Sequence, residues 1–123
     1  MLSKILVVDD EVKACELLKR FLELKGYEVI ISNNGEDAIE SVKNEKPDVM
    51  LLDIRMPGME GTEVLKRVRE FDKDIGIIMV TAVKEEYVGK AALTSGADEY
   101  ITKPIDFNYL ETSLLVDLVM RKK

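Results

Sequence analysis

Five short apolar segments alternate along the chain with stretches whose apolar residues recur every three or four positions. The apolar segments are residues 4–8, 28–31, 48–52, 75–80 and 99–102, and the amphipathic stretches are residues 11–25, 33–45, 61–71, 84–95 and 106–121. Apolar runs of this length are typical of strands buried on both faces, and the periodic stretches are typical of helices with one buried side. Strands separated by helices form parallel sheets, because a parallel pair needs a long crossover. We therefore predict an α/β fold of three layers, with a five-stranded parallel sheet between helices.

The chain length and the handedness of crossovers narrow this prediction further. A length of 123 residues suits one domain, so we expect a single domain over residues 1–123. Right-handed crossovers leave few topologies, of which the flavodoxin-like (βα)5 arrangement has the strand order 2-1-3-4-5. Gly26 and Gly96 stand where the first and fourth helices should end. The order 2-1-3-4-5 is the possibility that we carry forward from these few.

Helical periodicity also predicts which side chains are buried. The expected inward residues are Ala14, Leu17, Leu18, Phe21 and Leu22, then Ala38, Ile39 and Val42, then Val64, Leu65, Val68 and Phe71, then Val88, Ala91 and Ala92, and finally Phe107, Leu110, Leu114 and Leu118. Cys15 lies near the first of these stripes and is interpreted as inert packing. Tyr109, Val116 and Met120 fall on nearly the opposite side of the last helix. They are either ordinary scattered surface residues or a surface for a partner or a second copy.

Composition excludes several classes of protein. The net charge of −6 leaves no cation excess for direct binding to nucleic acid or to an anionic membrane. One cysteine and no histidine exclude an internal disulfide, a Cys/His zinc site and a histidine general base. No apolar run approaches the length of a membrane span or resembles a signal peptide. We expect a cytoplasmic protein whose chemistry uses carboxylates, hydroxyls or lysines.

Acidic residues follow two of the predicted strands. The segment "DVMLLDIRMPGMEG" carries a buried strand that ends on Asp53, and Asp9 and Asp10 directly follow the first strand. A buried carboxylate is costly without a partner. In an open α/β sheet with this strand order, strands one and three end side by side at the ligand-binding edge. We therefore expect Asp9, Asp10 and Asp53 to converge there.

Two further side chains should reach the same edge. Thr81 follows the fourth strand and Lys103 follows the fifth. A cluster of carboxylates without His or Cys suits a hard cation such as Mg²⁺, and Mn²⁺ would also fit. Carboxylates, an ammonium, a hydroxyl and a divalent ion together suit phosphoryl chemistry, in which a carboxylate acts as the nucleophile. Asp53 is the best candidate for that nucleophile because it lies centrally.

Four motifs, "ILVVDDE", "DVMLLDIRMPGMEG", "IIMVTA" and "SGADEYITKP", follow one another in this order, and through them the whole chain resembles the receiver domains of two-component response regulators. The resemblance implies that Asp53 accepts a phosphoryl group from a phosphohistidine of a sensor kinase or histidine phosphotransfer protein. It also implies that Mg²⁺ is held by Asp10, Asp53 and the backbone carbonyl of Arg55, with Asp9 acting through water.

The resemblance assigns further roles beyond the metal site. Thr81 and Lys103 would contact the phosphoryl oxygens, and the peptide bond before Pro104 would be cis. Tyr100 would be the switch aromatic that moves inward from an exposed position when Thr81 moves. The surface formed by helix four, strand five and helix five would then change and control a downstream effector, or a homodimer that depends on phosphorylation. A switch of this kind is not an enzyme with a separate substrate.

Alternatives remain at this point. A metal-dependent phosphohydrolase would need a general acid two residues after the nucleophile, where this chain has Arg55. A flavin-binding carrier would need a phosphate loop after strand one, and "DDEVKA" would repel a phosphate. A pseudo-receiver would bind without becoming phosphorylated. Arg55 and Val83 replace polar groups that orient water in many relatives, which predicts slow self-dephosphorylation.

Overall fold

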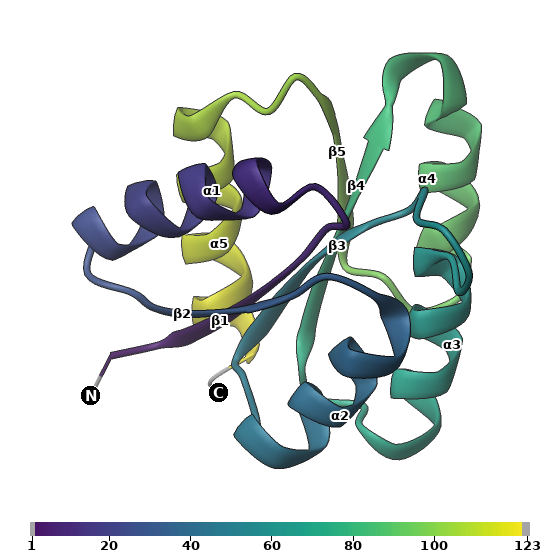
Figure 1. Ribbon diagram of the computed structural model, residues 1–123, viewed down its shortest axis with the longest axis horizontal. Helices are drawn as coiled ribbons and strands as arrows, with labels where there is room; N and C mark the ends of the chain where they lie inside the picture. The colour runs from purple at the N-terminus through teal and green to yellow at the C-terminus, as the bar shows by residue number, and fades with distance from the viewer. Residues whose placement is uncertain (1, 122–123) are drawn as a thin grey trace.

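A five-stranded parallel sheet runs through the centre of the computed structural model, which describes residues 2–121 (Figure 1). The strands are β1 (Lys4–Val8), β2 (Glu28–Ser32), β3 (Val49–Asp53), β4 (Gly76–Ala82) and β5 (Glu99–Lys103). They pair in parallel in the order β2-β1-β3-β4-β5. The predicted α/β fold and strand order are therefore confirmed.

Helices cover both faces of this sheet. They are α1 (Val12–Leu24), α2 (Gly35–Glu45), α3 (Gly61–Phe71), the 3-10 turn η1 (Val83–Glu85), α4 (Glu86–Thr94) and α5 (Phe107–Arg121). The apolar residues of α1 and α5 pack on one face, and those of α2, α3 and α4 pack on the other (Figure 1). Among residues 2–121, no helix is long and apolar enough to cross a membrane.

The central strand β3 shows how the sheet fixes its carboxyl-terminal edge. Met50 and Leu52 pack with the α2, α3 and α4 side, whereas Val49 and Leu51 pack with the α1 and α5 side. All four side chains are at most 1% exposed. Because each fully buried side chain of this kind contributes roughly 1.5–3 kcal/mol, the end of β3 is held rigidly. Asp53 is therefore presented at a defined place.

Three residues that helical periodicity predicted to be buried are exposed, so the prediction was wrong for them. Leu17 is 58% and Phe71 45% exposed, and Ala91 is also exposed while its neighbour Ala92 is buried. The buried stripes are narrower than the apolar stripes in the sequence, because each helix touches the sheet along one line only. Phe71 is the last residue of α3, and the Lys43 ammonium lies 5.2 Å from the centre of its ring. The ammonium therefore covers part of this exposed ring with a favourable cation–π contact.

Segment boundaries also differ from the prediction at the fourth helix. The residues expected to begin it form η1, and α4 starts only at Glu86. Thr81 lies inside β4 and Lys103 is the last residue of β5, whereas both were expected directly after their strands. Both side chains nevertheless remain at the carboxyl-terminal edge. The turn between β4 and α4 is therefore built from η1.

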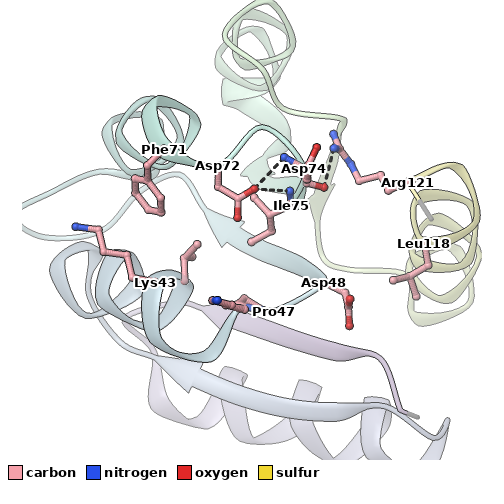
Figure 2. A pocket seen from close by; sticks show the side chains of 11 residues that line it. Lys43, Pro47, Asp48, Phe71, Asp72, Asp74, Ile75, Leu118 and Arg121 are labelled. Atoms are coloured by element: carbon pink, nitrogen blue, oxygen red, sulfur yellow. Dashed lines mark hydrogen bonds between the residues drawn. The ribbon is translucent and has the colours of Figure 1, made fainter. Parts of the chain in front are cut away.

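A groove of about 530 Å³ lies at the amino-terminal edge of the strands, away from Asp53 (Figure 2). Polar side chains that line this groove form hydrogen bonds with backbone groups of nearby turns. Asp72 Oδ1 accepts hydrogen bonds from the N–H groups of Asp74 and Ile75, at 2.9 and 3.0 Å, and Arg121 donates to the Asp74 carbonyl at 2.9 Å. These groups are engaged in holding α3, β4 and α5 together at this edge.

A polar cluster with one buried member, Asp117, lies beside this groove. Arg121 donates from Nε to Asp98 Oδ2 at 2.9 Å and lies 3.0 Å from Asp117 Oδ1. Asp117 is 8% exposed, and its Oδ2 atom is buried without a hydrogen-bond partner. Burial and the neighbouring Asp98 carboxyl raise the pKa of Asp117 to about 7. Asp117 therefore binds a proton more readily than an exposed carboxyl group does.

Candidate functional site

Three carboxylates meet at the carboxyl-terminal edge of the sheet. One oxygen from each of Asp9, Asp10 and Asp53 lies within 4.8 Å of the others. Asp9 and Asp53 are each 6% exposed, whereas Asp10 faces solvent. The expected convergence of these residues is present in the structure. The cluster therefore has two buried carboxylates and one exposed carboxylate.

Strand pairing explains why these residues meet. Val8 and Leu52 are register partners in β1 and β3, so the residues that follow them stand side by side. The loop after β1 is fixed by Asp9, whose Oδ1 accepts a hydrogen bond from the Glu11 N–H at 2.9 Å. The Asn33 amide donates to the Asp9 carbonyl at 2.8 Å. Asn33 supports the site from the β2–α2 loop, a role that its own segment of sequence does not signal.

The Lys103 ammonium pairs with two carboxylates of this cluster. It lies 3.3 Å from Asp53 Oδ2 and 3.7 Å from Asp9 Oδ2. Burial and the charge of Asp9 nevertheless raise the pKa of Asp53 to about 6, although Lys103 acts in the opposite direction. One ammonium therefore neutralises three carboxylates incompletely, and the remaining negative charge fits a bound divalent cation. The Lys103–Pro104 peptide bond is cis, as the resemblance implied.

Thr81 is buried next to this edge, but its hydroxyl is engaged in the following turn. The hydroxyl oxygen lies 3.3 Å from the Glu85 carbonyl and 3.4 Å from the Ala82 carbonyl, and its single proton is shared between these two acceptors. Both distances are long for O–H···O bonds, so they are weak. The hydroxyl could therefore exchange these carbonyls for a better acceptor at a small cost.

Tyr100 occupies a half-buried position, which differs from the expected exposed one. Its ring packs against the core on the α2, α3 and α4 side, and its hydroxyl donates to Glu86 Oε2 at 2.7 Å. Gly89 leaves room for the ring, because a Cβ atom at that position would lie 2.9 Å from it. The half-buried ring therefore packs from β5 against α4.

Arg55 makes contacts that the sequence does not signal. Its Nε atom donates to Glu85 Oε2 at 2.8 Å and Nη2 contacts the same oxygen at 2.5 Å, while Nη1 donates to Glu60 Oε1 at 2.7 Å. The Arg55 side chain thus points to the β4–α4 turn and to the start of α3. Glu85 lies 30 residues from Arg55, a separation that no local motif links.

Gly61 is the other residue that local sequence does not assign to the site. An added Cβ atom there would lie 2.2 Å from the Asp53 carbonyl oxygen. The Gly61 N–H also donates to the Ile54 carbonyl at 2.8 Å. The start of α3 therefore passes directly over the backbone of the candidate nucleophile, and only glycine fits there.

Known proteins share both the sequence and the fold. The family model of the response regulator receiver domain matches residues 5–115. The chain is 41% identical over 122 residues to the alkaline phosphatase synthesis transcriptional regulatory protein PhoP of Bacillus subtilis, covering 99% of this chain and 50% of that protein. It is also 41% identical over 110 residues to the transcriptional regulatory protein ZraR of Klebsiella oxytoca, covering 89% of this chain and 25% of that protein.

Solved structures agree with these matches. A CheY-like response regulator receiver domain protein from Methanospirillum hungatei superposes with a TM-score of 0.91 at 35% identity, over 99% of this chain and 98% of that one. The chain spans half the length or less of the two curated relatives. Sequence motifs, strand order and the acidic edge all agree, and the chain belongs to the response regulator receiver domain family.

Proposed function

We propose that Asp53 accepts a phosphoryl group from a phosphohistidine on a partner sensor kinase or histidine phosphotransfer protein. The observation that carries this proposal is the Asp53 carboxylate at the acidic edge, with the Lys103 ammonium 3.3 Å away. An Asp53 oxygen attacks phosphorus, a P–O bond forms, and the P–N bond to the imidazole breaks. The imidazole retains the electron pair and takes up a proton. The product is an aspartyl phosphate on β3.

Residues at this edge would stabilise the charge that moves in the reaction. Asp10, Asp53 and the Arg55 carbonyl would hold Mg²⁺, with Asp9 acting through a water molecule. The ion would neutralise oxygens of the transferred group. Lys103 would pair with another phosphoryl oxygen from the side of β5, since its ammonium already lies between Asp9 and Asp53. Mn²⁺ suits the same oxygen ligands.

The Thr81 hydroxyl would couple phosphorylation of Asp53 to a change at the protein surface. Phosphorylation adds about −1.5 to −2 charge and three acceptor oxygens. One of those oxygens is a stronger acceptor than the carbonyls at 3.3 and 3.4 Å that Thr81 contacts now. Movement of Thr81 would alter the β4–α4 turn, and the Tyr100 ring on the same face of the sheet would follow. The change is a two-state equilibrium biased by a local bond.

Intact mass after incubation with acetyl phosphate and Mg²⁺ tests the acceptor. We expect the native chain to gain one phosphoryl group and Asp53→Asn to gain none. Asp48→Asn is a control, because Asp48 lies at the other end of β3, where its carboxylate accepts a hydrogen bond from the Lys4 N–H. A native chain that stays unmodified would indicate a pseudo-receiver. Steady turnover of phosphate esters would indicate the phosphohydrolase.

We further infer that the phosphoryl group leaves slowly. The Arg55 guanidinium is paired with Glu85 and Glu60, and it has no acceptor for a water proton. The Val83 side chain is apolar and 61% exposed, so it cannot orient an attacking water molecule. The decay of the phosphorylated mass with Mg²⁺ present measures this lifetime, and a half-life of seconds would contradict the inference.

The output surface would comprise α4, β5 and α5. Tyr109, Val116 and Met120 are 50%, 57% and 59% exposed on α5, as expected for an unpaired helix face. A downstream effector, or a second copy after phosphorylation, would cover them. Light scattering with and without beryllofluoride distinguishes a second copy from an effector as the partner. A monomer in both states would refute the homodimer.

A further inference from the structure

The side chains of Arg55, Thr81 and Tyr100 converge on two adjacent residues at the start of α4. Thr81 donates to the Glu85 carbonyl at 3.3 Å, and Arg55 holds the Glu85 carboxylate through Nε at 2.8 Å. The Tyr100 hydroxyl donates to the carboxylate of the next residue, Glu86, at 2.7 Å. The Glu85–Glu86 dipeptide therefore contacts β4, β5 and the loop that follows β3.

We infer that the Arg55–Glu85 ion pair is a latch that holds the β4–α4 turn in its unphosphorylated arrangement. This inference rests on the proposed function, because a latch matters only if Thr81 moves toward a phosphoryl group. When the Thr81 hydroxyl leaves the Glu85 carbonyl, that carbonyl loses its side-chain partner and the turn around Glu85 can rearrange. Arg55 opposes the rearrangement by holding the side chain of the same residue.

The geometry of the pair distinguishes it from an ordinary surface pair. Two nitrogens of the Arg55 guanidinium contact one Glu85 oxygen, and the third nitrogen contacts Glu60 at 2.7 Å. The Arg55 side chain is 48% exposed and the Glu85 side chain 22%, and Arg55 lowers the pKa of the Glu85 carboxyl group. Charge-assisted contacts in a network are stronger than isolated exposed pairs. Arg55 is thus a positioning residue that acts through the turn.

Beryllofluoride affinity in the presence of Mg²⁺, measured by titration calorimetry, tests the latch. Arg55→Met and Glu85→Gln each remove the pair, and each should tighten binding about three- to tenfold, because less free energy opposes the bound arrangement. A through-space charge effect predicts opposite signs, since one variant removes a positive and the other a negative charge. The double variant should match either single variant, because both remove the same interaction.

Glu60→Gln is the matched control. It removes a charge beside the Arg55 guanidinium but leaves both Arg55 contacts to Glu85 in place, and a Gln side chain can still accept a hydrogen bond from Nη1, so its affinity should stay within about twofold of the native value. Hydrogen exchange without ligand gives an independent measurement. Amides of residues 82–88 should exchange faster in Arg55→Met and Glu85→Gln than in the native chain or in Glu60→Gln.

The outcomes separate the latch from the function on which it rests. A native chain that does not bind beryllofluoride would overturn the proposed function and the latch with it. Normal binding with unchanged or weaker affinity in the two latch variants would overturn the latch alone. Unchanged exchange over residues 82–88 would also overturn it.

Discussion

Removal of the Asp53 charge should stabilise the metal-free protein. Asp53 is 6% exposed, and burial together with Asp9 raises its pKa from 3.8 to about 6, against the pull of Lys103. Each pKa unit corresponds to about 1.4 kcal/mol, so ionised Asp53 lowers the free energy of unfolding by about 3 kcal/mol. Asn has the shape of the neutral acid. We expect Asp53→Asn to raise the free energy of unfolding by about 1–3 kcal/mol at about pH 7.5.

The pH dependence of this difference has a defined sign. Because the folded pKa of Asp53 is raised, the folded state binds more protons than the unfolded state between pH 3.8 and about 6. Native stability therefore falls relative to Asp53→Asn as the pH rises through that window. The difference between the two proteins should be absent below the window and complete above it.

Urea unfolding followed by circular dichroism, with and without Mg²⁺, measures both effects. A cation at the acidic edge would stabilise the native chain by about 2.7 kcal/mol at a concentration 100 times its dissociation constant, and would stabilise Asp53→Asn less. Glu40→Gln removes an equal charge from the exposed side of α2 and should change stability by less than about 0.5 kcal/mol. If Asp53→Asn is no more stable than Glu40→Gln, then ionised Asp53 does not destabilise the folded protein, and the reasoning from its burial and from Asp9 is refuted.

Three further substitutions probe the surroundings of the site and the opposite edge. Gly61→Ala should cost more than about 3 kcal/mol in urea unfolding, because its Cβ atom would lie 2.2 Å from the Asp53 carbonyl oxygen; near-native stability would refute that contact. Asp117, with a pKa raised to about 7 by burial and Asp98, makes stability fall as the pH rises from about 4 to 7. Asp117→Asn should flatten that part of the pH profile, and an unchanged slope would assign it to other groups. Asn34→Ala removes the side-chain cap of α2, an N–H···O bond of 2.8 Å, and should lower the melting temperature through a loss of about 1 kcal/mol; an unchanged melting temperature would show that solvent replaces the cap.

The fold and the acidic edge were predictable because both follow from short-range pattern and topology. Apolar runs separated by amphipathic stretches allow a parallel sheet, and parallel strands bring their carboxyl ends to one edge. Asp9 and Asp53 needed only the pairing of β1 with β3 to become neighbours. Lys103 needed only its place at the end of β5.

Contacts between loops were not predictable from the same patterns. Arg55 and Glu85 are 30 residues apart, and nothing in either segment specifies the partner. The burial of Asp117 could not be predicted for a different reason. A carboxylate on a helix is usually expected to face solvent, whereas Asp117 is 8% exposed and pairs with Arg121. Leu17 shows the reverse error, since its apolar side chain lies outside the line along which α1 meets the sheet.

The acidic edge depends on the core beneath it more than on its own contacts. Ionised Asp53 costs about 3 kcal/mol, and one lysine at 3.3 Å does not cancel that cost. Leu6, Met50 and Leu52, in the two strands that carry the carboxylates, are each 0% exposed, and each contributes roughly 1.5–3 kcal/mol. The cost of ionised Asp53 is therefore similar in size to the burial of one or two such side chains. Core truncations in β1 or β3 should therefore impair the site through stability, even though they touch none of its polar atoms.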